Sequence, residues 1–118
     1  EEQFRLGLER GAYHILGLRL GGRMVGYAAF SVIQDEMEIM NLAVHPEFRR
    51  RGFGARLLDA VLRHSRAAGA QQGFLDVKES NIPAIDLYRK FGFNQIGVRK
   101  RYYPDTREDA LLFRCDIP

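Results

Sequence analysis

One stretch, residues 41–55, restricts the possible fold more than any other part of the chain. It reads as a β-strand that stops at a proline, then a loop with three consecutive arginines and two glycines, and then a helix. Gly52 and Gly54 have no Cβ atom at the point where the chain turns into the helix, so the backbone there can take positive φ values and lie close to a ligand. The first amides of a helix have no partner inside the helix and stand at the positive end of its dipole. Together with Arg49, Arg50 and Arg51, these amides favour a phosphate or pyrophosphate; the alternative is a solvated basic turn capped by glycines.

The composition of the chain limits the number of domains and the cellular compartments that we expect. The chain has 118 residues, of which 46% are hydrophobic, so we expect residues 1–118 to form one globular domain. No apolar run approaches the ~20 residues of a membrane helix, and the chain does not open with a charged and then apolar signal peptide. We therefore expect a cytoplasmic protein that does not enter a membrane. The chain starts at Glu1 and not at methionine, which leaves open whether residues before it are missing.

The cysteine content and the net charge indicate the redox compartment and the kind of ligand that the protein can bind. Cys115 is the single cysteine, so no internal disulfide can form, which fits a reducing compartment. It stands in the last apolar run, which favours a buried, small hydrophobic role. The net charge of +3 permits an anionic ligand without requiring nucleic acid.

The first half of the chain predicts a helix end followed by three strands. Residues 1–10 look like the end of a helix, with apolar residues among charges and a stop at Gly11. Three β-prone segments then follow, with turns at Gly21-Gly22 and Gln34-Asp35 between them: residues 13–20, 24–33 and 36–44. Three strands joined by such turns form an antiparallel meander.

The second half predicts alternating helices and strands. The helix after the glycine loop should end at Gly69, and its apolar stripe consists of Leu57, Leu58, Val61, Leu62 and Ser65. A strand at 72–78 precedes a second helix, which Ser80 or Asn81 caps, which carries Pro83 in its first turn, and which ends at Gly92. Two strands, at 93–103 and 110–116, complete the chain. A strand, helix, strand order implies parallel neighbouring strands joined by a right-handed crossover, so we expect an α/β sheet of mixed direction.

The glycine loop also carries a family resemblance. The pattern Arg49-x-x-Gly52-x-Gly54 resembles the Gln/Arg-x-x-Gly-x-Gly/Ala signature of the GNAT N-acetyltransferases. The resemblance spans roughly residues 13–117. It implies the GNAT (acyl-CoA N-acyltransferase) fold, an α/β fold with a mixed, mostly antiparallel sheet, a splayed parallel pair of strands and flanking helices. The first strand of that fold and most of its first helical pair are expected to be absent.

The same resemblance implies acetyl-CoA as cosubstrate, and no metal. The strand ending at Val44 and the strand carrying Asp76 would splay apart and admit the pantetheine arm, which would pair with the backbone of Leu42, Ala43 and Val44. The pyrophosphate would rest on the loop, and the implied coenzyme contacts there are Arg49, Arg50, Arg51, Gly52, Phe53, Gly54 and Ala55.

The second half narrows the resemblance to the RimI-type ribosomal-protein-alanine N-acetyltransferases. It is carried by Leu75-Asp76-Val77-Lys78-Glu79-Ser80-Asn81, Ala84-Ile85-x-Leu87-Tyr88-x-x-Phe91-Gly92-Phe93, Arg101-Tyr102-Tyr103-Pro104 and Arg107-Glu108-Asp109-Ala110. The Tyr-Tyr-Pro and Glu-Asp-Ala pieces are far more specific than the glycine loop. The resemblance implies transfer of an acetyl group to the N-terminal α-amine of a ribosomal protein.

Attack of an amine on a thioester needs a base for the amine and an acid for the departing thiolate. The resemblance makes Tyr88 the acid and Asp76 the base; on composition alone Tyr88 fits a core position and Asp76 an exposed place in a strand. RimI-type enzymes carry a glutamate where Asp76 stands, and aspartate is one methylene shorter, so a bridging water would have to span the gap. Glu79 is a second candidate base, and His45 and His64 are weaker ones.

An N-terminal α-amine needs a weaker base than a lysine side chain does, because its pKa is lower. A free α-amine has a pKa of ~7.7–8.0, against ~10.4 for lysine, so its deprotonation at neutral pH costs roughly 1 kcal/mol instead of more than ~4. An aspartate that acts through water therefore suits an N-terminal amine better than a lysine side chain.

Four further residues have two readings each. Asn81 is a helix cap and, by the resemblance, a coenzyme contact; Tyr102, Tyr103 and Glu108 resemble the hairpin that covers the peptide, but equally fit a sheet edge and a charged surface. We expect acetyl-CoA and the N-terminal segment of a protein as partners, without nucleic acid or membrane. The open alternatives are a GNAT acting on a small amine or a lysine side chain, a non-catalytic acyl-CoA-binding domain, and a phosphate or RNA-backbone binder. The last lacks the interleaved aromatic residues of a nucleic-acid surface.

Overall fold

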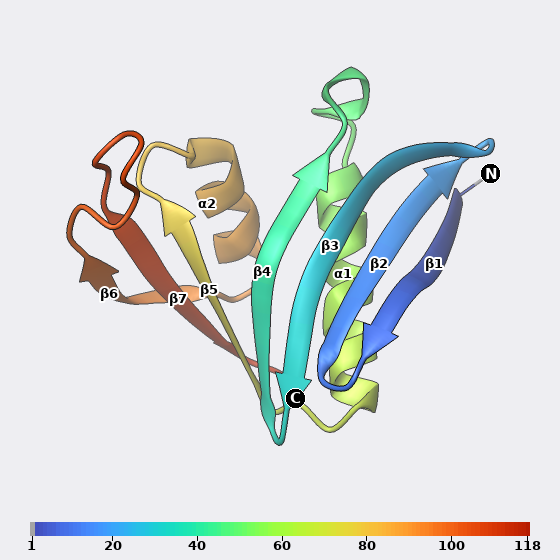
Figure 1. Ribbon diagram of the computed structural model, residues 1–118, viewed down its shortest axis with the longest axis horizontal. Coiled ribbons are helices and arrows are strands. Elements are labelled where there is room, and N and C mark those ends of the chain that lie inside the picture. Colours follow the sequence, from blue (N-terminus) through green and yellow to red (C-terminus); the bar gives the residue numbers. More distant parts are fainter. Residues whose placement is uncertain (1) are drawn as a thin grey trace.

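The computed structural model describes the backbone of residues 2–118 and the side chains of Phe4 and of residues 11–118. The described chain forms a mixed sheet of seven strands in the spatial order β1-β2-β3-β4-β5-β7-β6, with two α-helices (Figure 1). β4 and β5 run parallel, and every other neighbouring pair is antiparallel. The elements are β1 Glu2–Arg10, β2 Tyr13–Leu20, β3 Arg23–Ile33, β4 Glu36–Val44, the 3₁₀ turn η1 Pro46–Phe48, α1 Phe53–Ala67, β5 Gln72–Lys78, α2 Ile82–Lys90, β6 Asn94–Arg99 and β7 Ala110–Asp116.

Residues 2–10 form strand β1, and the prediction of a helix end at residues 1–10 is wrong for all of these; residue 1 lies outside the described part. β1 pairs antiparallel with β2, and Gly11 takes a φ of 61° in the turn between them. The reason lies in the sequence itself, because Phe4, Leu6 and Leu8 recur at every second residue, which is the period of a strand. A strand thus precedes β2 in the described chain, and no helix lies between the two.

The other strands lie where the sequence predicts them, apart from the end of β6. β4, β5 and β7 have the predicted bounds. β6 was expected to reach Tyr103 but ends at Arg99, and Arg101 takes a φ of 50°. Because such a conformation does not continue a strand, the chain leaves the sheet there in a loop, residues 100–109, that returns at β7.

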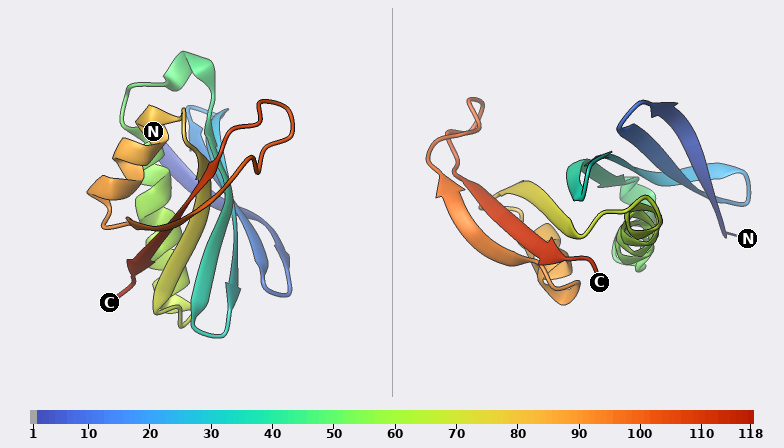
Figure 2. Two further views of the ribbon diagram at one scale, coloured as in Figure 1. Left: turned by 90° about the vertical axis from the view of Figure 1, so that its left-hand side faces the viewer. Right: turned by 90° about the horizontal axis from the view of Figure 1, so that it is seen from below.

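Both helices lie on the same side of the sheet, and the other side carries no helix in the described chain (Figure 2). α1 packs on β2, β3 and β4. α2 begins at a cap formed by Asn81, whose side-chain oxygen accepts a hydrogen bond from the Ala84 amide at 3.4 Å, and Pro83 lies in its first turn as predicted. Neither helix combines the length and the apolar character that a membrane crossing requires.

The buried apolar side chains form two clusters. The larger joins both helices to the centre of the sheet, and Cys115 lies in it. Burial raises the pKa of the Cys115 thiol to about 11, so the thiol stays protonated and acts as the small hydrophobic residue that was predicted. The smaller cluster lies beneath the turn that follows β4 and consists of Leu18, Val25, Phe48, Phe53 and Leu57. Since Phe48 and Phe53 flank residues 49–52, this cluster anchors both ends of the glycine loop.

Candidate active site

β4 and β5 separate about half-way along their length. Their parallel ladder ends at Ile39 opposite Leu75, although β4 continues to Val44 and β5 to Lys78. Figure 1 shows the two strands diverging toward their carboxyl ends. The backbone groups of β4 that face this gap have no strand partner in the described chain, so an extended ligand can pair with them.

A β-bulge at Met40 marks the start of the separation. Ala29 pairs with Asn41 and Phe30 pairs with Ile39, so Met40 is an extra residue without a partner in β3. A bulge bends its strand, increases the local twist and shifts the alternation of the side chains that follow. The bulge therefore gives a local cause for the departure of β4 from β5.

The amino end of α1 stands above the gap. Gly52 is the N-cap of α1 with a φ of 82°, and no side chain caps the helix. A Cβ atom on Gly54 would lie 3.4 Å from Leu87 of α2, so glycine keeps a gap open between the two helices. Free helix amides beside such a gap are suited to bind an anion.

A groove of about 530 Å³ runs between this loop and α2. Arg49 and Arg50 line it, whereas Arg51 places its guanidinium over the rings of Phe48 and Phe53, 5.2 and 5.6 Å from their centroids. Two of the three arginines thus reach the groove, and the third braces the loop. The full lining is Val44, Phe48, Arg49, Arg50, Gly52, Phe53, Gly54 and Ala55 on the loop side, and Pro83, Asp86, Leu87, Lys90 and Phe91 on the α2 side.

A second hollow, of about 200 Å³, lies between β4 and β5, and we call it the central hollow. It brings together Asp76, Asn81, Tyr88 and Tyr103, together with Leu42 from β4. These residues come from separate elements and were predicted to act at one site. The remaining lining residues are Ile39, Met40, Asn41, Leu75, Val77 and Lys78. Of the other two predicted pantetheine contacts, Val44 lines the groove and Ala43 lies in a shallow apolar depression next to Tyr27.

Burial raises the pKa values of both Tyr88 and Tyr103, and different charged neighbours raise each of them further. The side chain of Tyr88 is buried, which is the main reason that its pKa rises to about 12; the charge of Tyr103 contributes as well. Burial also raises the pKa of Tyr103, followed by the negative charges of Asp76, Tyr102 and Glu108. Tyr88 is therefore fully protonated at neutral pH and can donate a proton, and Asp76 lies close enough to Tyr103 for its charge to be felt there.

The loop of residues 100–109 is fastened to the carboxyl end of β5. The Lys78 ammonium lies 3.2 Å from an Asp105 oxygen and 5.1 Å from the centroid of the Tyr103 ring. The Glu108 carboxylate accepts a hydrogen bond from the Ser80 amide at 3.2 Å. These contacts hold Tyr103 at the wall of the central hollow.

Tyr102 and Glu108 do not line the central hollow, unlike Tyr103. The exposed Tyr102 ring stands edge-on to Tyr103, with a centroid distance of 5.2 Å, and carries the Arg99 guanidinium over its face. Hydrogen bonds from Ser80 and Thr106 lower the pKa of the Glu108 carboxyl, so it is ionised while it holds the loop. Of the three residues predicted to contact the peptide, only Tyr103 reaches the hollow directly.

The weaker candidate bases stand elsewhere. His45 accepts a hydrogen bond from the Glu47 amide at 3.2 Å and so belongs to the turn after β4. His64 packs its ring against His14 at a centroid distance of 5.0 Å, beside Phe30. Glu79 is exposed and is not part of the central hollow.

Sequence reasoning gave no role to Lys78 or to the α2 residues that line the groove. Lys78 follows Asp76 by two residues and therefore shares its face of β5, which is a signal that the sequence contained. Asp86 and Lys90 lie one helical turn apart and face the groove, but nothing in the sequence indicates which side of α2 meets the glycine loop.

Known proteins resemble this chain in sequence. The model of the Acetyltransferase (GNAT) family matches residues 1–93. The [ribosomal protein bS18]-alanine N-acetyltransferase of Escherichia coli (strain K12) is 37% identical over 102 residues, which cover 85% of this chain and 69% of that protein.

Solved structures resemble it as well. The crystal structure of the ribosomal-protein-S18-alanine N-acetyltransferase from Escherichia coli matches with a TM-score of 0.86 and 34% identity, over 92% of this chain and 72% of the other. A Bacillus subtilis acetyltransferase in complex with CoA matches with a TM-score of 0.89 over 100% of both chains at 16% identity, which is a likeness of fold. With a family match over most of its length and a relative of this identity, the chain belongs to the GNAT family of acetyltransferases.

Proposed function

We propose that this protein transfers the acetyl group of acetyl-CoA to the N-terminal α-amine of a protein, and that the acceptor is a ribosomal protein of the bS18 type. One observation carries the proposal most strongly: the central hollow, where β4 and β5 separate, gathers Asp76, Asn81, Tyr88 and Tyr103. The names of the E. coli relatives supply the acceptor class.

The groove beside α1 fits the phosphate end of acetyl-CoA. The pyrophosphate would bind the amides of Arg50 through Ala55 at the helix amino end, with Arg49 and Arg50 beside it. The gap that glycine keeps open at Gly54 gives these amides access to an anion. The pantetheine arm would extend along the unpaired edge of β4, at Leu42, Ala43 and Val44. Asn81 keeps its role as the cap of α2 and reaches the same hollow.

The side chains in the central hollow suit direct transfer. The amine nitrogen attacks the thioester carbonyl, the new C–N bond forms, the C–S bond breaks, and the sulfur leaves as a thiolate. Asp76 would take the proton of the amine through a water, because its carboxylate is short, and Tyr88 would give its phenolic proton to the thiolate. Tyr103 would form the wall against which the peptide end rests, with Tyr102 and Glu108 supporting it from the loop.

Turnover of acetyl-CoA against a panel of acceptors tests this proposal. The panel contains a peptide that begins with alanine and follows the N-terminus of bS18, the same peptide with a blocked N-terminus and one lysine, and a polyamine. We expect release of CoA with the first peptide and little with the others. Preference for the lysine peptide or the polyamine would assign the chain to another substrate class, and binding of acetyl-CoA without any turnover would make it a non-catalytic acyl-CoA-binding domain.

A further inference from the structure

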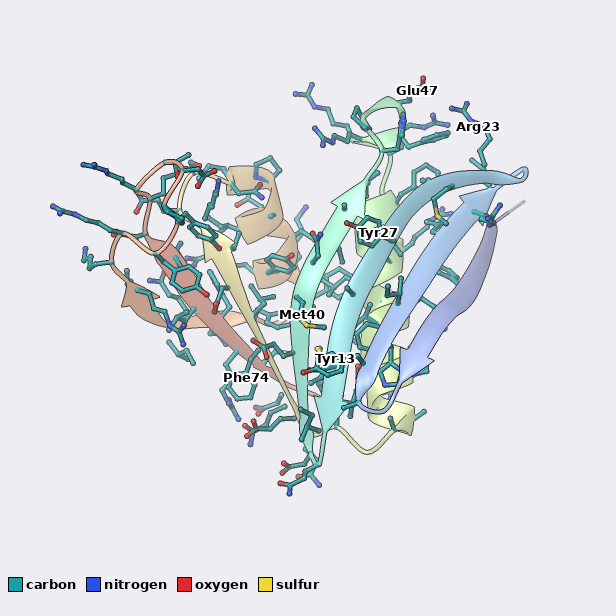
Figure 3. The ribbon with its side chains drawn as sticks, viewed as in Figure 1. Tyr13, Arg23, Tyr27, Met40, Glu47 and Phe74 are labelled. Atoms are coloured by element: carbon teal, nitrogen blue, oxygen red, sulfur yellow. The ribbon has the colours of Figure 1, made fainter. Side chains whose placement is uncertain are left out.

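The bulge at Met40 turns Asn41 away from the core. Ile39 lies in the larger core cluster and Leu42 packs against it, although only two residues separate them. Because side chains alternate along a strand, a regular β4 would put these two on opposite faces. The extra residue resolves this, so that Met40 and Asn41 are both exposed on the side of the sheet that carries no helix in the described chain, which we call the open face. Figure 3 shows Met40 in front of the strands and α1 behind them.

Tyr27 of β3 holds the side-chain amide of Asn41. Asn41 Nδ2 donates a hydrogen bond to the Tyr27 hydroxyl at 2.8 Å, and Figure 3 shows Tyr27 on the open face as well. β3 and β5 flank β4 on opposite sides. An amide whose nitrogen reaches toward β3 therefore turns its carbonyl oxygen toward β5, into the gap between the two parallel strands. In the described chain this oxygen has no hydrogen-bond partner, so it can accept a hydrogen bond from a ligand.

Asp76 faces the same hollow from the opposite strand. Its neighbours Leu75 and Val77 are buried in the core, so the exposed Asp76 also lies on the open face. Past the last ladder pair, Ile39 with Leu75, Asn41 is the second residue of β4 and Asp76 the first of β5. Both line the central hollow, and of the described β4 residues that line it, Asn41 alone has a polar side chain. A ligand that reaches Asp76 from the open face therefore passes the Asn41 amide.

An N-terminal amine differs from other amines in the groups that follow it. The first peptide bond comes within one residue of the α-amine, ~3.5 Å along an extended chain, and its N–H is a hydrogen-bond donor. A lysine side chain or a polyamine has only methylene groups at that distance. The carbonyl oxygen of a side-chain amide accepts a hydrogen bond from a peptide N–H, and a site built for such a bond disfavours an amine that lacks the donor.

We propose that Asn41 is a specificity residue, whose Oδ1 atom accepts a hydrogen bond from the first peptide N–H of the acceptor, and that Tyr27 is the positioning residue that orients its amide. This inference rests on the proposed function, because it places the acceptor amine beside Asp76. It assigns to the β4 side of the central hollow the recognition of a peptide N-terminus over a lysine side chain or a polyamine.

Two acceptors that differ in one atom group test the proposal. The first is a hexapeptide that begins with alanine, and in the second an oxygen atom replaces the N–H of the first peptide bond, so that an ester follows the same α-amine. We measure kcat and KM of both acceptors with the wild type and with Asn41→Ala. We expect the wild type to prefer the peptide by about tenfold, the effect of one hydrogen bond, mainly through KM because the bond acts on binding.

In Asn41→Ala, the peptide should lose this advantage, whereas the ester compound should keep its rate. A difference in amine pKa between the two acceptors is the same for both proteins, so it cancels when their preferences are compared. Asn41 is exposed, so its truncation should leave the fold intact, which thermal denaturation verifies.

A pair of tyrosine variants tests the positioning role. Tyr27→Phe keeps the ring and the Asn41 side chain but frees the amide to rotate, so the preference for the peptide should fall by a few-fold. Tyr13→Phe is the matched control, because Tyr13 is also an exposed tyrosine on the open face but does not line the central hollow. It should leave the preference unchanged, and an equal loss in both variants would contradict the role of Tyr27.

The outcomes separate this inference from the proposed function. If the wild type acetylates the peptide and the ester compound equally well, or if its preference survives in Asn41→Ala, Asn41 does not recognise the peptide bond although the enzyme is an N-terminal acetyltransferase. If the wild type acetylates no alanine-terminated peptide at all, the proposed function fails and this inference fails with it.

Discussion

Tyr88 and Asp76 share the central hollow but have opposite surroundings. Tyr88 is buried among the side chains of the larger core cluster, so the cost of burying its anion keeps the phenol protonated. Asp76 is exposed on β5, where water can reach its carboxylate. A buried proton donor and a hydrated carboxylate are what an acid and a water-assisted base require.

Replacement of Tyr88 by phenylalanine tests its role as the acid. Tyr88→Phe keeps the ring and its contact with Phe93, whose centroid lies 5.7 Å away, but loses the proton. We expect kcat to fall by ~10²–10⁴, with little change in acetyl-CoA affinity. In the wild type, the raised pKa of about 12 keeps the phenol protonated until that pH is approached, so Tyr88 should cause no loss of rate at mildly alkaline pH. Near-normal turnover by Tyr88→Phe would leave Tyr88 as a core residue.

Asp76 is tested by a series of carboxylate variants. Asp76→Asn should slow turnover by ~10² or more at neutral pH, and much less at high pH, where the α-amine has already lost its proton. Asp76→Glu should retain or raise the rate, because it restores the longer reach of the glutamate. Glu79→Gln is the matched control and should have nearly normal rates, since Glu79 is not part of the central hollow. The pH dependence of kcat/KM measures all three, and damage in Glu79→Gln without damage in Asp76→Asn would move the base to Glu79.

Among the elements, α1 and the loop before it form the unit that should bind phosphate. The chain enters the helix through Gly52 in the left-handed conformation, and no side chain forms a capping hydrogen bond at the helix amino end. Arg23 of β3 forms an ion pair with Glu47 of η1 at 2.7 Å, and its guanidinium lies over the Phe48 ring. Both charged residues are labelled at the top of Figure 3. Both side chains are more than half exposed, so the pair itself stabilises the turn only weakly. The aromatic contacts of Phe48 are the more important anchor.

A negative charge at the amino end of α1 tests the coenzyme site. Gly54→Asp places a side chain and a carboxylate in the gap between the loop and Leu87, and we expect acetyl-CoA affinity to fall at least about tenfold, or ~1.4 kcal/mol. Gly54→Ala adds only a Cβ atom at ordinary contact distance and should lose far less. Calorimetric titration of both folded variants measures the difference. Equal affinities in the two variants and the wild type would place the phosphates elsewhere.

At the scale of the whole molecule, the buried side chains of the described residues form two clusters, one that joins both helices to the sheet and one beneath the glycine loop. Leu57 and Leu58 are adjacent, fully buried residues of α1, but Leu57 packs with Phe48 and Phe53 beneath the glycine loop, whereas Leu58 packs in the larger cluster. The two leucines therefore offer a matched pair of variants in which the same atoms are removed from different clusters.

We expect Leu57→Ala and Leu58→Ala each to lower the free energy of unfolding by ~2–5 kcal/mol, the usual cost of a buried leucine. Only Leu57→Ala should also weaken acetyl-CoA binding under conditions where the protein is folded, because the cavity lies under the loop. Urea denaturation and calorimetric titration measure the two effects. Equal losses of affinity in both variants would show that the clusters act as one core.

Local patterns in the sequence determined most of the elements and indicated the candidate site residues. Period-two segments between turn residues located β4, β5 and β7, because strand periodicity and turn chemistry act over a few neighbouring residues. The glycines and arginines of residues 49–54 indicated a candidate anion site for the same reason. The helix predicted at residues 1–10 was an error of period, since the alternation of apolar residues there already favoured a strand.

Only the tertiary structure decided where these residues meet. The bulge at Met40 and the early end of the β4–β5 ladder depend on three strands at once, so no local pattern reports them. The neighbouring residues Tyr102 and Tyr103 are chemically alike, yet Tyr103 alone lines the central hollow, because the ties of Lys78 and Glu108 set the path of the loop. Contacts between residues distant in the sequence carry no local signature, and they decide which groups share one space.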